Sequence, residues 1–151
     1  DVVWDPFVGS GSELIERARL GPAKKFIGTD IDPAALDAAR TNAKAANVDA
    51  TIVEGDALSY VPGKVTLVLT NPPMGRRVHR GADLRPFFDR FFGHVATVLA
   101  PGGRIVLISP LPARTAERAR ELGLVQERGI DVDMGGFSAQ IQHFSRAKAK
   151  V

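Results

Sequence analysis

The segment Asn71-Pro72-Pro73-Met74 closely follows an uncharged apolar run at residues 65–69. The run is rich in leucine and β-branched residues, a composition that is typical of a strand buried on both faces of a parallel sheet. Asn71 comes where this strand ends, and open α/β sheets bind ligands at that edge. Each proline lacks an N–H and disfavours the helical conformation of the residue before it, so the segment predicts a stiff, extended corner.

Two hydrogen-bond acceptors meet at this corner, the side-chain oxygen of Asn71 and the main-chain carbonyl of Pro72. A planar amino group has two N–H donors and would fit such a pair. The corner therefore predicts a site that orients an amino group. An ordinary turn is the alternative, because Asn-Pro is a common turn signal.

A glycine loop follows the first expected strand, residues 2–4, and reads Asp5-Pro6-Phe7-Val8-Gly9-Ser10-Gly11. Gly9 and Gly11 allow the main chain to turn sharply and to approach a ligand closely. Leu14 takes the place of the third glycine of the dinucleotide motif, and no Gly-Lys-Ser/Thr follows. NAD, FAD and a P-loop phosphate are therefore disfavoured.

Acidic residues come at two further strand ends. Asp30 ends the expected strand 25–30, about 20 residues after the glycine loop, where nucleotide-binding folds place an acid that accepts both ribose hydroxyls. Ile31 could then cover one face of an adenine. Asp56 follows the strand 51–53 and could accept the adenine amino group, although a turn or helix-capping role is equally open. Asp32 is interpreted as the N-cap of the next helix, with Pro33 in its first turn.

Strands alternate with helices along the chain, and two strands without a helix between them end it. This order predicts one α/β domain over residues 1–151, with a doubly wound, mostly parallel seven-stranded sheet of the Rossmann type and a C-terminal antiparallel hairpin. The remaining strands are expected at 65–69, 104–109, 124–132 and 139–145. The helices are expected at 13–18 with Ser12 as N-cap, from 33, over the apolar stripe 84–99, and at 113–122.

The composition excludes several function classes. The chain has no cysteine, which excludes disulfides, cysteine-ligated zinc and a thiol nucleophile, and its three histidines show no metal-ligand spacing. No metal is predicted. No apolar run approaches the roughly 20 residues of a membrane span, and no signal peptide is recognisable, so a cytoplasmic protein without membrane contact is expected. The net charge of +3 permits a nucleic-acid partner.

The motifs resemble those of the class I S-adenosylmethionine-dependent methyltransferases over essentially the whole chain. The matching segments are Asp5-Pro6-Phe7-Val8-Gly9-Ser10-Gly11, Gly28-Thr29-Asp30-Ile31-Asp32, Gly55-Asp56-Ala57 and Asn71-Pro72-Pro73-Met74. Within this class, the chain is most similar to RNA guanine-N2 methyltransferases, whose catalytic domain often follows an RNA-binding THUMP domain. Because the chain starts within a strand and without Met, it is expected to be the catalytic domain of a longer protein with a further N-terminal RNA-binding domain.

The resemblance implies methyl transfer from S-adenosyl-L-methionine to an exocyclic amino group of a nucleic-acid base, guanine N2 in tRNA or rRNA. Catalysis is assigned to Asn71 and Pro72, and substrate binding to Pro73, Met74, Arg76 and Arg77. The cofactor-binding residues are then Asp5, Phe7, Gly9, Ser10, Gly11, Asp30, Ile31, Asp56 and Ala57. One departure matters: Met74 stands where the family usually has Tyr or Phe, which weakens an aromatic stack on the base.

Three alternatives stay open. The same Asn-Pro-Pro corner serves DNA adenine-N6 and protein glutamine-N5 methyltransferases. The arginines that follow it, among them Arg76 and Arg77, favour a nucleic acid over a peptide if they contact phosphates, but such a cluster could equally face water. The third alternative is a non-catalytic RNA-binding module with this fold.

Overall fold

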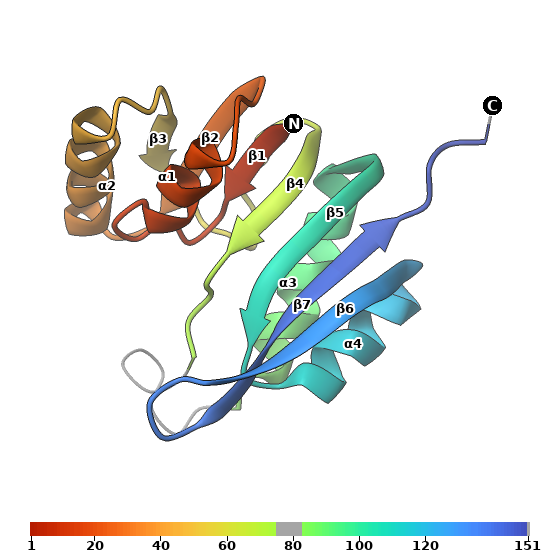
Figure 1. Cartoon of the computed structure of the whole chain (residues 1–151). Coiled ribbons are helices and arrows are strands. Elements are labelled where there is room, and N and C mark those ends of the chain that lie inside the picture. The colour runs from red at the N-terminus through yellow and green to blue at the C-terminus, as the bar shows by residue number, and fades with distance from the viewer. Residues whose placement is uncertain (75–82, 151) are drawn as a thin grey trace.

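The structure is a computed structural model that describes residues 1–74 and 83–150. Its centre is a seven-stranded sheet with the order β3-β2-β1-β4-β5-β7-β6 (Figure 1). The strands are β1 (Val2–Asp5), β2 (Lys25–Asp30), β3 (Thr51–Glu54), β4 (Val65–Thr70), β5 (Leu99–Ser109), β6 (Leu124–Asp133) and β7 (Ser138–Arg146). The helices are α1 (Ser12–Arg19), α2 (Pro33–Ala45), α3 (Arg85–Val98) and α4 (Pro112–Glu121).

Strands β1 to β5 pair in parallel, and β7 pairs antiparallel with both β5 and β6. The predicted fold class is therefore confirmed, including the antiparallel hairpin at the C-terminal end of the sheet. The strand order reverses between β1 and β4, because β2 and β3 lie on one side of β1 while β4 and β5 lie on the other. Open α/β sheets bind ligands at such a reversal, outside the carboxyl ends of the strands.

Two hydrophobic clusters hold the helices to the sheet. On one face, Leu14 of α1 and Leu36 and Ala39 of α2 pack against Val3 and Phe26. On the other face, the aromatic side of α3 packs against Trp4 and β5, as the apolar stripe predicts. Phe92 belongs to this buried set as well, together with Phe88, Phe91, Val95 and Val98.

The start of α2 is as expected, whereas the start of α1 differs. Asp32 caps α2, and its carboxylate accepts a hydrogen bond from the N–H of Ala34 at 2.9 Å. The N-cap of α1 is Gly11, with φ 86°, and no side chain caps this helix. The expectation of Ser12 as the N-cap is wrong because Ser12 already belongs to the helix, and a glycine tolerates the left-handed conformation that the tight turn before it requires.

Strand β5 begins earlier than expected. The sequence Pro101-Gly102-Gly103 predicts a turn, yet the strand extends from Leu99 to Ser109, and Leu99 pairs with Val65. The register between β4 and β5 shifts after this pair, between Val65 and Leu67. An irregular ladder of this kind accommodates the proline and the glycines inside one strand.

Close packing between β2 and the glycine loop leaves no room for a side chain at Gly28. A Cβ at this position would lie 2.6 Å from Val8 Cγ2 and 3.1 Å from Leu14 Cδ1. We predict that Gly28→Ala lowers the free energy of unfolding by about 1–3 kcal/mol, the cost of overpacking a tight core. Chemical denaturation of the two proteins measures this difference.

The same substitution at Gly93 is the matched control. Gly93 lies within α3, and an added Cβ would meet only the flexible end of Arg118, at 3.3 Å. Because alanine is favoured over glycine inside a helix by about 0.5–1 kcal/mol, Gly93→Ala should leave the protein as stable or more stable. Equal losses in the two variants would contradict the packing account.

Candidate functional site

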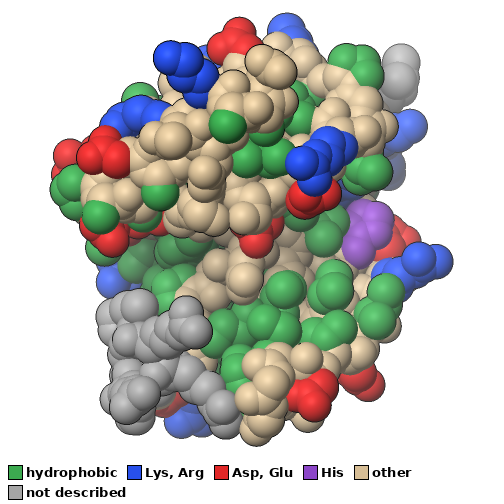
Figure 2. All heavy atoms as spheres, turned by 60° about the vertical axis from the view of Figure 1, so that its left-hand side comes forward, with side chains coloured by type: hydrophobic (Ala, Val, Ile, Leu, Met, Phe, Trp, Pro, Cys, Tyr) green, Lys and Arg blue, Asp and Glu red, His purple; other side chains and the backbone are tan. Residues whose placement is uncertain are grey.

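A pocket of about 1060 Å³ opens at the edge of the sheet where the parallel strands end. Figure 2 shows this side of the molecule, with hydrophobic side chains gathered over its middle and lower part. The wall comes from six separate parts of the chain. Its residues are Pro6, Phe7, Asp30, Ile31, Asp32, Ala35, Asp56, Leu58, Asn71, Pro72, Pro73, Met74, Phe87, Met134, Gly135 and Phe137.

Most of the candidate residues converge on this pocket. Phe7, Asp30, Ile31 and Asp56 line it near the ends of β1, β2 and β3, and Asn71-Pro72-Pro73-Met74 line it from the end of β4. The corner and the acidic ends of β2 and β3 therefore belong to one cavity, although Asn71 comes 64 positions after Phe7 in the sequence. The predicted substrate-binding residues Arg76 and Arg77 lie outside the described residues.

Asp5 does not line the pocket itself but directly precedes Pro6 and Phe7, which do. It is fully buried, and its Oδ1 accepts hydrogen bonds from Thr70 Oγ1 at 2.6 Å and from the N–H of Phe7 at 3.0 Å. Its second oxygen, Oδ2, has no partner among the residues that the structure describes. Burial raises the pKa of Asp5 to about 8, against the lowering effect of the hydrogen bond from Thr70.

The glycine loop is fixed by Asp30. Its carboxylate accepts hydrogen bonds from the N–H of Gly9 through Oδ2 and from the N–H of Asp32 through Oδ1, both at 3.0 Å. Asn42 of α2 holds the same loop by donating to the carbonyl of Ser10 at 2.9 Å. Each oxygen of Asp30 keeps further acceptor capacity, so this residue can fix the loop and still receive a ligand hydroxyl.

The β3 end supplies one residue to the pocket and one to the core. Asp56 is exposed, lines the pocket and accepts a hydrogen bond from the N–H of Leu58 at 2.8 Å, so the turn role that the sequence allows is present. Ala57 is buried in the hydrophobic core and does not line the pocket. Ile31 is 70% exposed beside Asp30, which leaves its side chain available to cover a flat ligand.

The corner at the end of β4 combines buried and exposed residues. Asn71 is exposed, whereas Thr70 before it and Pro72 after it are buried. This contrast leaves the amide of Asn71 accessible to the pocket while the main chain on both sides is held. Pro73 and Met74 continue the wall.

Several lining residues had not been singled out from the sequence. Asp32 had been assigned only to helix capping, yet it lines the pocket too. Phe87 had been assigned only to the core stripe of α3. Met134, Gly135 and Phe137 come from the turn between β6 and β7, and no local pattern links that turn to Asn71, because only the strand order brings them together.

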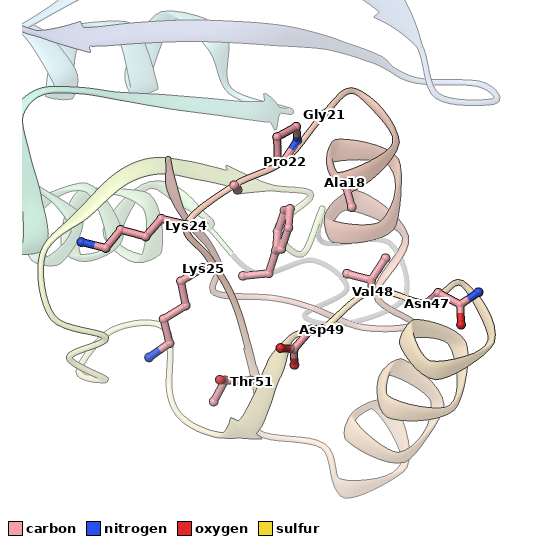
Figure 3. Close-up of a pocket in the computed structure, with 11 residues that line it drawn as sticks. Ala18, Gly21, Pro22, Lys24, Lys25, Asn47, Val48, Asp49 and Thr51 are labelled. Carbon is pink, nitrogen blue, oxygen red and sulfur yellow. The ribbon is translucent and has the colours of Figure 1, made fainter.

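A second hollow, of about 360 Å³, lies at the opposite edge of the sheet, where β2 and β3 begin (Figure 3). It is lined by Lys24, Lys25, Asn47, Asp49 and Thr51, among others. In the figure, the two lysine side chains point away from each other. None of the candidate residues lines this hollow.

Within 1–74 and 83–150, no group of three or more Asp, Glu or His side chains is arranged to hold a metal ion. In the same ranges, none of the helices has the length and apolar character needed to cross a membrane.

Comparison with known proteins identifies similar methyltransferases. A family model described as RMKL-like, methyltransferase domain, matches residues 1–139. A tRNA (guanine(6)-N2)-methyltransferase of Thermus thermophilus is 33% identical over 139 residues, which cover 89% of this chain and 41% of that protein. The crystal structure of TrmN from Thermus thermophilus superposes with a TM-score of 0.80 at 29% identity and covers 95% of this chain and 43% of that chain.

A relative whose name gives a protein rather than an RNA substrate matches as well. A Methanocaldococcus jannaschii protein named for protein N5-glutamine methyltransferase activity is 33% identical over 114 residues, which cover 67% of this chain and 57% of that protein. The chain thus spans about half the length of the curated relatives it matches.

The raised pKa of Asp5 predicts a pH dependence of stability. Between its unfolded value of 3.8 and its folded value of about 8, the folded protein keeps a proton that the unfolded chain releases. The free energy of unfolding should therefore fall as the pH rises through this window, with a slope of up to about 1.4 kcal/mol per pH unit from one proton. Denaturation at a series of pH values measures this slope.

The variant Asp5→Asn removes the titrating group and should flatten the curve between pH 4 and 8. Asp37→Asn is the matched control, because Asp37 is exposed on α2 and should leave the slope unchanged. A wild-type slope that Asp5→Asn does not alter would show that Asp5 is ionised in the folded protein.

Proposed function

The chain belongs to the RMKL-like methyltransferase domain family, and on this basis we propose that it transfers a methyl group from S-adenosylmethionine to the exocyclic N2 amino group of a guanine in RNA. One observation carries the proposal: the Asn71-Pro72 corner and the acidic ends of β2 and β3 line the same pocket. A cofactor and an acceptor can therefore meet in one cavity of about 1060 Å³.

The residues present fit this cofactor. Asp30 and Asp56 offer carboxylates for the hydroxyls of a ribose and the amino group of an adenine, and the exposed Ile31 lines the same pocket. The buried Oδ2 of Asp5 has no partner among the described residues, and Asp5 directly precedes Pro6 and Phe7, which line the pocket. Gly9 and Ser10 form the loop that Asp30 and Asn42 hold in place.

S-adenosylmethionine supplies an already activated methyl group, so the protein mainly has to position the acceptor. The lone pair of an exocyclic amine is delocalised into its ring. The two N–H groups of the amine donate hydrogen bonds to Asn71 Oδ1 and to the Pro72 carbonyl. These hydrogen bonds favour a pyramidal nitrogen whose lone pair points at the methyl group. No strong base has to remove a proton first, in agreement with the amide at position 71.

The choice of RNA rests on several supports. The Thermus relative that spans 89% of this chain is a tRNA guanine-N2 methyltransferase, and the superposing TrmN structure has a TM-score of 0.80. The net charge of +3 suits a polyanionic partner. The second candidate is a glutamine side-chain amide, which the Methanocaldococcus relative favours by its name.

Substitution of Asn71 tests the proposal directly. Because Asn71 is exposed, Asn71→Ala should change the free energy of unfolding by no more than about 0.5 kcal/mol. It should leave S-adenosylmethionine affinity within a few-fold and lower kcat by roughly 100-fold or more, as the loss of one well-placed polar group in an active site does. The assay measures methyl transfer to RNA by folded, cofactor-saturated protein.

The control is Asn71→Asp, which keeps the shape and the acceptor oxygen and should retain partial activity. If Asn71-Pro72 were a turn and nothing more, both variants would transfer methyl groups at the wild-type rate per folded molecule. A near-normal kcat of Asn71→Ala would therefore refute the catalytic role.

A further inference from the structure

Thr70 is the last residue of β4, and the two neighbouring strands hold it in different ways. Toward β5, the ladder continues to its end, because Thr70 pairs with Leu107. Toward β1, which lies beside β4 (Figure 1), the ladder stops two residues earlier, at the pair Trp4 and Val68. On this side, the hydroxyl of Thr70 donates a hydrogen bond to Asp5 Oδ1 at 2.6 Å. This side-chain bond therefore joins β1 to the end of β4 beyond the last pair of the ladder.

Both partners of this hydrogen bond are buried. Asp5 is fully buried, and Thr70 is 2% exposed. Asp5 Oδ1 also accepts a hydrogen bond from the N–H of Phe7 at 3.0 Å, and Phe7 lines the pocket. Burial strengthens such bonds and leaves no solvent to replace a lost donor. The position of Thr70 relative to the pocket wall at Phe7 is therefore closely defined, although Thr70 itself does not line the pocket.

The corner that follows Thr70 depends on this anchor. Pro72 and Pro73 have no N–H group, so neither can donate a main-chain hydrogen bond that would fix the corner. Pro72 is buried, but apolar packing has no preferred direction, whereas the hydrogen bond of Thr70 does. The direction in which the exposed Asn71 leaves the sheet is therefore set through Thr70.

From this arrangement we infer that Thr70 is a positioning residue for methyl transfer and that it acts through Asn71. Its hydrogen bond to Asp5 fixes the start of the corner, so that the amide of Asn71 meets the acceptor amine at the right distance from the methyl group. The inference rests on the proposed function and adds to it a residue that does not touch the substrate. A misplacement of about 1 Å between reacting groups can lower a rate by roughly 100-fold, so the loss of this hydrogen bond should be visible in kcat.

The test compares Thr70→Val, which keeps the shape of the side chain but removes the hydroxyl, with Thr70→Ser, which keeps the hydroxyl. The assay measures methyl transfer from saturating, isotopically labelled S-adenosylmethionine to total RNA from a strain that lacks the gene, per folded molecule. Thr70→Val should lower kcat by roughly 10- to 100-fold, and Thr70→Ser should restore most of it. Calorimetry should show S-adenosylmethionine affinity within a few-fold of wild type, because Asp5 keeps the hydrogen bond from Phe7.

Thr115→Val is the matched control. Thr115 is also fully buried, and its hydroxyl donates to Gln142 Oε1 at 2.6 Å, the same length as the bond from Thr70. It lies on α4 and does not line the pocket. Each valine variant loses one buried hydroxyl, so both should lower the free energy of unfolding. Only Thr70→Val should lower kcat per folded molecule, and an equal drop in Thr115→Val would overturn the inference.

A double variant tests whether Thr70 acts through Asn71. The protein that combines Thr70→Val with Asn71→Ala should have a kcat within a few-fold of Asn71→Ala alone, because the amide that Thr70 directs is already absent. If the two losses multiply instead, Thr70 acts independently of Asn71 and the inference is wrong.

Two further results would overturn the inference and leave the proposed function standing: wild-type kcat in Thr70→Val, or no rescue by Thr70→Ser. If Thr70→Val does not fold, Thr70→Cys takes its place, because its S–H group is a weaker donor. A kcat of Thr70→Cys below that of Thr70→Ser then supports the inference, and an equal kcat overturns it. If the wild-type protein methylates no RNA, the proposed function fails and the inference fails with it.

Discussion

The hydrogen bond between Thr70 Oγ1 and Asp5 Oδ1, 2.6 Å long and fully buried, connects the two halves of the site. It joins the end of β1 to the end of β4 at the point where the strand order reverses. On the β1 side, Asp5 also receives the N–H of Phe7 at the start of the glycine loop. On the β4 side, Thr70 directly precedes Asn71. One buried contact therefore fixes the glycine loop and the Asn71 corner relative to each other.

A methyltransferase of this kind depends on such a constraint. The protein contributes position more than chemical reactivity, so an error of even 1 Å between acceptor and methyl group is costly. The carboxylate of Asp30, which binds Gly9 and Asp32, extends the rigid frame to β2 and α2. The amide of Asn71 is exposed to the pocket, whereas Thr70 before it and Pro72 after it are buried.

Much of this arrangement could be predicted from the sequence. Asp5, Asp30, Asp56 and Asn71 each follow a short apolar run, and parallel strands bring their carboxyl ends to one edge. Local patterns of this type also identify the cap of α2 at Asp32, since the signal lies within three residues.

Features that depend on long-range pairing could not be predicted in this way. The contribution of Met134 and Phe137 follows from the place of β7 between β5 and β6, which no local pattern encodes. The early start of β5 at Leu99 depends on pairing with Val65 across a register shift. The buried state of Asp5 reflects its surroundings in three dimensions, so its raised pKa has no signature in the glycine-loop motif.

We propose that the Asn71 corner directs methyl transfer to the N2 amino group of a guanine in RNA. Mass spectrometry of nucleosides tests it most directly, after RNA from a strain lacking the gene is incubated with the protein and S-adenosylmethionine that carries a deuterated methyl group. Labelled N2-methylguanosine is expected, and roughly 100-fold less of it when Asn71→Ala replaces the wild type at equal concentration and time. Label that appears only in N6-methyladenosine, or in no nucleoside, would contradict this proposal.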